Sequence, residues 1–194
     1  MGPVTSLRNL SAPLVRELGK SSFTRFLYIL GYHEVFSNKG FLGKLTKLTC
    51  VRLGILCSGI MDLIHDYSPK NDDYNRFIAY MGHYPSGTSL NTMKHLAQLM
   101  NFGFGRFGTK VPYDFSKIKN VPIVLIVGKD DTLATPQDNR ILKIILEKQG
   151  VLNFYKEYRN TGHTSFFISK SNIFMKDVVE KINEFSKDFL IEKE

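Results

Sequence analysis

One stretch, Val121–Asp138, constrains the fold more than any other part of the chain. Residues 123–127 form a short, β-branched apolar run between a proline and a glycine, which predicts a strand buried on both faces, as in a parallel sheet. Two carboxylates, Asp130 and Asp131, follow the strand directly. A threonine–proline pair then offers an N-cap and a first-turn proline for a helix, with Asp138 in the first turn. Open α/β sheets bind ligands at the carboxyl ends of their strands, so this edge is the expected site.

A second unit of the same kind follows. The helix from Pro136 is expected to end at Gly150, and Val151–Tyr158 is expected to be the next strand. A polar turn, Asn160–Phe166, carries one histidine. The last helix is predicted from apolar residues spaced by three and four: Phe174, Val178, Ile182, Phe185 and Phe189.

Asp131 and His163 therefore each follow a predicted strand, 32 residues apart. In α/β-hydrolases the acid and the histidine occupy these two places, in the chain order Ser, Asp, His. The alternative is that each residue is ordinary, because an aspartate after a strand is commonly a turn or cap residue and a lone histidine in a polar turn is usually on the surface.

Four separated blocks carry a family likeness in their motifs and their order. They are Met1–Val4, His83–Met93, Gly128–Ala134 with Pro136–Asp138, and Gly162–His163 with Phe166; Tyr113–Pro122 adds to them. Together they resemble the C-terminal part of the acid lipases, the family of the lysosomal acid, gastric and lingual lipases. The likeness covers nearly the whole chain and is loose between Leu10 and Tyr80.

The resemblance implies an α/β fold: the C-terminal portion of an α/β-hydrolase sheet with a helical cap, or lid, inserted. Residues 1–9 would be the end of a core strand, 10–110 the helical cap, and 111–194 the C-terminal part of the hydrolase core. The alternative for the middle segment is a separate helical domain. The implied activity is hydrolysis of triacylglycerol or cholesteryl esters by a Ser-Asp-His triad without a cofactor.

In that family Asp131 would orient the histidine, and His163 would be the general base toward serine and then the acid toward the leaving alcohol. Asp130 competes with Asp131 for the acid's role. The ungapped match through Leu133–Ala134 favours Asp131.

The nucleophile is absent, because no Gly-x-Ser-x-Gly elbow occurs in these residues. Ser86 lies next to a proline and lacks the elbow's spacing, and Ser58 fits no better. We therefore expect an incomplete lipase whose nucleophile lies in a missing N-terminal hydrolase half, either upstream or on another chain. The rival hypothesis is a non-catalytic lipid-binding or interaction protein derived from a lipase.

Helical signals dominate from Leu10 to Phe107, where we see no alternating strand pattern. Ser21 or Ser22 is expected to cap one helix and Asn71–Asp73 to begin another. Ser89 is expected to cap a third helix that ends at Gly103.

The formal net charge of +8 suggests a nucleic-acid partner, but the 26 Lys and Arg residues form no run of five and no RNA-binding signature accompanies them. We expect a basic, solvated surface with neutral lipid esters or a lipid surface as partners and no nucleic acid.

The sequence gives no sign of a metal site, a membrane span or a secretory leader. The histidines do not have metal-ligand spacing, and no apolar window approaches the ~18 residues of a membrane span. The N-terminus shows no secretory signal, although the resemblance implies a secreted or lysosomal protein.

Two features matter only in an oxidising or secretory compartment. The resemblance implies pairing of Cys50 with Cys57, whereas seven residues of continuous helix span ~10 Å and favour two buried thiols. Asn9 begins an Asn-Leu-Ser sequon and is a glycosylation candidate.

Overall fold

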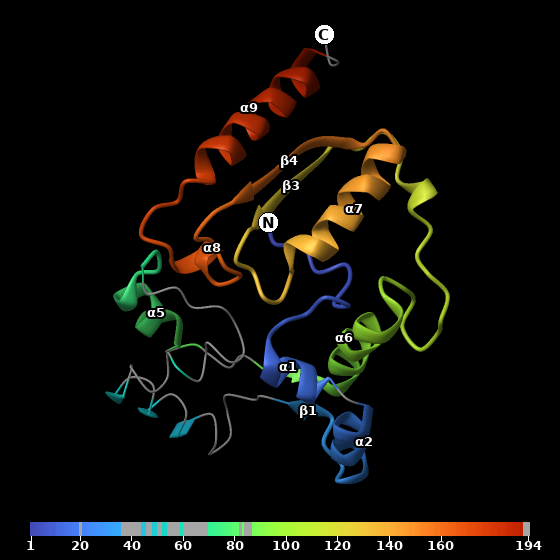
Figure 1. The fold of residues 1–194 in the computed structure, drawn as a ribbon, viewed down its shortest axis with the longest axis vertical. Coiled ribbons are helices and arrows are strands. Elements are labelled where there is room, and N and C mark those ends of the chain that lie inside the picture. The colour runs from blue at the N-terminus through green and yellow to red at the C-terminus, as the bar shows by residue number, and fades with distance from the viewer. Residues whose placement is uncertain are drawn as a thin grey trace.

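The structure is a computed structural model that describes residues 1–19, 21–35, 44–45, 48–49, 52–53, 59, 70–81, 83 and 87–191. Its upper half in Figure 1 contains two strands between long helices, and its lower half is mainly helical, with the short strand β1. The upper elements are η1 (Phe115–Lys117), β3 (Ile123–Gly128), α7 (Pro136–Lys148), β4 (Leu152–Tyr158), α8 (Ser165–Ile168) and α9 (Met175–Ile191). The lower elements are α1 (Pro13–Leu18), α2 (Ser21–Ile29), β1 (Glu34–Val35), α5 (Tyr74–Met81), β2 (Thr88–Ser89) and α6 (Leu90–Phe102).

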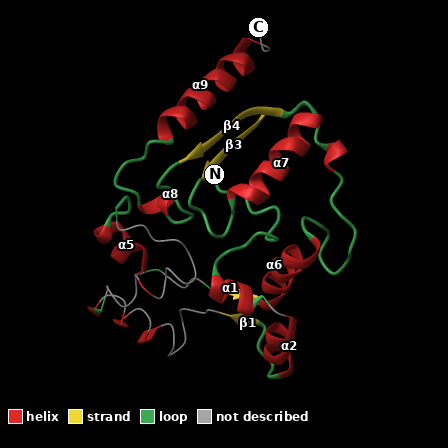
Figure 2. Ribbon diagram, viewed as in Figure 1, coloured by secondary structure: helices red, strands yellow, loops and turns green. Residues whose placement is uncertain are grey.

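The predicted parallel sheet is confirmed, since β3 pairs with β4 in parallel from Ile123 opposite Leu152 to Gly128 opposite Tyr158. Figure 2 shows α7 on one side of this pair and α9 on the other. The two carboxyl ends of the strands lie at one edge, as a βαβ unit requires.

Alternating β3 side chains fill the two faces of the sheet. Leu125 and Val127 pack in a cluster with Leu142 and Leu146 of α7, while Ile126 packs with Tyr158 and Phe174 near the start of α9. Full burial of each aliphatic side chain stabilises the fold by roughly 1.5–3 kcal/mol, so a strand that is apolar on both faces holds both helices.

The predicted ends of α7 are also confirmed. The Thr135 hydroxyl accepts a hydrogen bond from the Asp138 amide at 3.4 Å, which satisfies a donor of the first turn. Gly150 follows the helix with φ +67°, a conformation that glycine adopts without a Cβ penalty.

In the lower half, the start and end predicted for α6 are confirmed: Ser89 Oγ accepts from the Thr92 amide, and Gly103 follows the helix with φ +73°. This part, where the sequence shows no alternating strand pattern, also contains two short strands. Strand β1 pairs antiparallel with β2, Glu34 opposite Ser89 and Val35 opposite Thr88. Each strand is two residues long, too short to leave a periodic pattern.

The chain begins beside β3 and then runs toward the helical part (Figure 1). None of residues 1–9 is in an assigned strand, but the Gly2 amide donates a 2.8 Å hydrogen bond to the Ile126 carbonyl. Leu7 and Leu10 then pack with Leu99 of α6. Assignment of residues 1–9 to the end of a core strand stays a prediction, as does the division at residue 110.

No helix within the described ranges is long and apolar enough to cross a membrane. Four residues named in the sequence analysis lie outside those ranges: Cys50, Cys57, Ser58 and Ser86.

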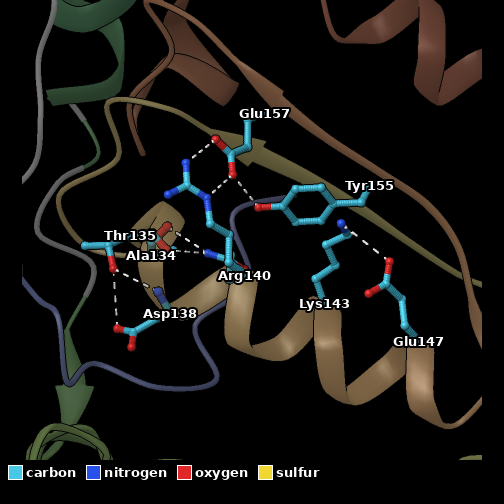
Figure 3. Close-up of polar contacts among 9 residues, drawn as sticks. Ala134, Thr135, Asp138, Arg140, Lys143, Glu147, Tyr155 and Glu157 are labelled. Atoms are coloured by element: carbon cyan, nitrogen blue, oxygen red, sulfur yellow. Dashed lines mark hydrogen bonds and ion pairs between the residues drawn. The ribbon is translucent and has the colours of Figure 1, made fainter.

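A polar cluster ties α7 to β4 on the surface (Figure 3). Arg140 donates two hydrogen bonds to the Glu157 carboxylate at 2.7 and 2.8 Å, and the Tyr155 hydroxyl donates a third at 2.6 Å. The Arg140 guanidinium holds the pKa of Glu157 below its usual range. Desolvation and the same carboxylate raise the pKa of Tyr155.

We predict that Glu157→Gln lowers the Tm at neutral pH. A carboxylate whose folded pKa is depressed contributes stability above its unfolded pKa and loses it as the pH falls through the folded value. The Tm difference between variant and wild type should therefore shrink as the pH falls below about 4.5, the ordinary glutamate value.

Glu147→Gln is the matched control for this measurement, because Glu147 pairs with Lys143 at 3.4 Å in an exposed i, i+4 pair. Thermal melts between pH 3 and 7 would test the assignment. A Glu157→Gln difference that is independent of pH would contradict it.

Candidate active site

Two loops meet at the carboxyl edge of the sheet: residues 129–135 after β3 and residues 159–164 after β4. The Lys129 amide donates to the Tyr158 carbonyl at 2.8 Å, and the Asp130 amide donates to the Thr161 carbonyl at 3.1 Å. These bonds continue the strand pairing into the loops, so the side chains that follow are held at a fixed separation.

The pairing brings Asp131 and His163 into contact. His163 Nδ1 lies 3.0 Å from Asp131 Oδ2. The Asp131 side chain is fully buried, whereas 26% of the His163 side chain is exposed. The acid is thus shielded from solvent while the ring reaches the surface.

The second Asp131 oxygen is held by the backbone of its own loop. Oδ1 accepts from the Leu133 amide at 2.9 Å and from the Ala134 amide at 2.7 Å. With His163, the carboxylate has three donors, which fix its orientation. An ionised carboxylate can only accept, so the geometry assigns the His163 proton to Nδ1, and Nε2 is the acceptor nitrogen of the neutral ring.

That arrangement can do base chemistry. A histidine oriented through Nδ1 by a buried carboxylate can take a proton at Nε2, and the carboxylate stabilises the resulting imidazolium. Among the two candidate acids, the structure brings Asp131 to the ring; Asp130 is exposed and uses its backbone amide to bind the histidine loop.

Gly2 also belongs to this site, and the sequence did not single it out as an individual residue. It has φ +52°, and a Cβ there would lie 3.4 Å from Asp131 Oδ2 and 3.5 Å from His163 Nδ1. The chain's first residues therefore pack directly against the Asp–His hydrogen bond. The Gly-Pro dipeptide of the Met1–Val4 block was the available signal, but position next to the site depends on tertiary structure.

Ser165 is the serine nearest to His163 along the chain. It is fully buried, and its Oγ accepts a hydrogen bond from the Gly162 amide at 3.0 Å. This hydrogen bond stabilises the histidine turn. Because Ser165 is fully buried, its hydroxyl is not accessible to a substrate as a nucleophile.

Asn9 contacts the first turn of α7. Its Nδ2, the atom to which a glycan would be attached, donates to the Asp138 carboxylate at 2.8 Å. Glycosylation of Asn9 stays a prediction.

Nothing in the described part of the chain forms a group of three or more His, Cys, Asp or Glu side chains that could hold a metal ion.

Comparison with known proteins finds lipases. Gastric triacylglycerol lipase of Rattus norvegicus is 31% identical over 190 residues, covering 86% of this chain and 45% of the relative. The human enzyme of that name is 27% identical over 205 residues, 96% of this chain and 50% of the relative. Human lipase member J is 30% identical over 160 residues, 73% of this chain and 43% of the relative. No family model matches the chain.

These relatives, with the βαβα order and the parallel sheet, place the chain in the α/β-hydrolase class. Within that class, the chain belongs to the acid lipase family. It spans about half the length of the curated relatives that it matches.

The approach of the two loops sets a tight limit at Gly128. A Cβ on this residue would lie 2.3 Å from the Thr161 carbonyl oxygen, which is backbone and cannot rotate away. We predict that Gly128→Ala destabilises the protein by about 3 kcal/mol, the upper range for overpacking, and separates the two loops.

Gly150→Ala is the matched control. That residue has φ +67° and open space around its Cβ position, so only backbone strain of about 1–2 kcal/mol applies. Urea unfolding and the amide NMR shifts of residues 129–135 and 159–164 would be measured for both. Equal stability losses, with unchanged loop shifts in Gly128→Ala, would refute the prediction.

Proposed function

We propose that this chain supplies the acid and the base of a lipase catalytic triad, with Asp131 as acid and His163 as base. The observation that supports this most directly is the 3.0 Å contact between His163 Nδ1 and the buried Asp131 carboxylate. Each residue follows one of two paired parallel strands, the location expected of the acid and base in α/β-hydrolases.

The proposed reaction is acyl transfer through a serine. His163 Nε2 takes the proton from the serine oxygen as it attacks the ester carbonyl, and then gives that proton to the leaving alcohol. Asp131 remains ionised and stabilises the imidazolium formed in between. Water then attacks the acyl-serine ester, with His163 again taking and returning the proton, and the carboxylic acid and the free serine are released.

The serine itself belongs to a Gly-x-Ser-x-Gly elbow that these 194 residues lack. We propose that an N-terminal hydrolase half, joined to this chain or on a second one, brings the nucleophile and the oxyanion hole.

The proposed substrates are neutral lipid esters, triacylglycerol or cholesteryl ester. The matched gastric relatives are named triacylglycerol lipases, and these names support the substrate class. Residues 10–110 would form the cap over the site, a role supported by the helices α1, α2, α5 and α6. The compartment would be lysosomal or extracellular.

The test restores the missing part and then removes each group. With an acid-lipase N-terminal half supplied by fusion or as a second chain, we predict that His163→Ala abolishes hydrolysis of a triacylglycerol emulsion. Asp131→Asn should lower kcat by roughly 10⁴-fold, as when a triad acid becomes an amide.

Asp130→Asn is the matched control, one residue away and exposed, and should change kcat/KM little. The 194-residue chain by itself should not turn over p-nitrophenyl esters. The assignment fails if Asp130→Asn is the crippling change, or if all three variants keep full activity. Circular dichroism of each variant would separate loss of chemistry from loss of fold.

A further inference from the structure

The carboxylate of Asp138 faces the N-terminal segment of the chain. The residue is 3% exposed. Its Oδ2 accepts from the Asn9 backbone amide at 3.1 Å, and its Oδ1 accepts from the Asn9 side-chain amide at 2.8 Å. The Thr135 hydroxyl is a third, longer donor at 3.4 Å. One asparagine therefore engages both oxygens of a buried carboxylate.

This use of Asp138 goes beyond helix capping. Asp138 is the third residue of α7, and an acidic residue at this position commonly reaches back to the backbone amide of the N-cap residue. Here the cap needs only the Thr135 hydroxyl and the Asp138 amide. The Asp138 side chain is directed instead to a residue 129 positions earlier in the sequence.

The same segment holds the other end of the loop. The Ser11 amide donates to the Thr132 carbonyl at 3.0 Å, directly after Asp131. Residues 9–11 therefore contact the loop just after its acid and again at the helix that follows it. Residues 133–137 lie between these contacts, and they include both amides that fix Asp131 Oδ1.

Helix α7 also holds the backbone of the Asp131 loop through Asn139. Asn139, which is 1% exposed, donates through Nδ2 to the Ala134 carbonyl at 2.8 Å and to the Thr135 carbonyl at 3.0 Å. The backbone of the loop is thus bound from α7 on one side and from residues 9–11 on the other. Both sets of contacts restrain the backbone that carries the Leu133 and Ala134 amides.

We propose that Asn9 and Asp138 are positioning residues: together they fix the loop that aims the Asp131 carboxylate at His163 Nδ1. In this role they act only through Asp131. The catalytic purpose of this positioning rests on the proposed function. Its effect on which His163 ring nitrogen carries the proton can be measured without any activity.

The ring tautomer is the readout. The group that hydrogen-bonds one ring nitrogen of a histidine sets which nitrogen is protonated, so the Asp131 carboxylate selects the Nδ1–H form. In the full 194-residue chain at about pH 8.5, above the ordinary histidine pKa of about 6.5, long-range ¹H–¹⁵N NMR reports the tautomer directly.

We expect wild-type His163 to be Nδ1–H and Asn9→Ala to shift a measurable fraction of the ring to Nε2–H. Arg8→Ala is the matched control, because Arg8 is adjacent and exposed and donates to the Phe102 carbonyl, away from the loop. It should keep the wild-type tautomer. A purely structural role for Asn9 would lower Tm without moving the tautomer.

Exchange of the two side chains gives the second test. Asn9→Asp alone opposes two carboxylates and should shift the tautomer further than Asn9→Ala does. Adding Asp138→Asn restores a carboxylate–amide pair of opposite polarity and should recover the Nδ1–H form. If Asn9→Ala unfolds, this exchange pair alone decides.

The proposal is overturned if folded Asn9→Ala keeps the wild-type tautomer, or if the exchange variant fails to recover it relative to Asn9→Asp. Failure of the proposed function would look different. It would show as absent ester hydrolysis when an N-terminal half is supplied, with the His163 tautomer still sensitive to Asn9.

Discussion

The parallel pairing of β3 with β4 is the constraint on which the site depends. It aligns Gly128 with Tyr158, so both loops leave the sheet at the same edge, and the first loop amides continue the ladder. Once the strands are in register, the backbone positions of Asp131 and His163 are fixed, and only their side-chain rotamers remain to be set. Burial of β3 on two faces provides the rigidity, and the carboxylate then needs only local amides to complete its orientation.

Most of this region could be predicted from the sequence because its signals are local. The apolar run 123–127, the Thr135 cap and Gly150 state where a strand and a helix begin and end, and a buried parallel strand has no polar face to confuse the pattern. Sequence motifs also located Asp131 and His163 beside each other. The two-residue strands β1 and β2 left no comparable trace, since pairing of that length is decided by the surrounding fold.

The surroundings of the Asp–His pair could not be predicted for the same physical reason. Gly2, Asn9 and Asp138 come together only in three dimensions, and no periodicity links residues more than a hundred positions apart. The sequence predicts Asp138 to be a first-turn acid, whose negative charge interacts favourably with the helix dipole. The structure shows that its side chain does more, because it satisfies the backbone and the carboxamide of Asn9.

The long sequence separation of the Asn9–Asp138 contact also bears on how the molecule assembles. Asp131 and His163 are 32 residues apart, whereas Asn9 and Asp138 are separated by 129. Loop-closure entropy makes the longer connection costlier by about 1.2 kcal/mol. The βαβα unit can therefore form from contacts between near neighbours before residues 9–11 dock on it. Docking of residues 9–11 would then be the step that fixes the orientation of Asp131 toward His163. Maturation of the site is, on this view, one of the last events in folding.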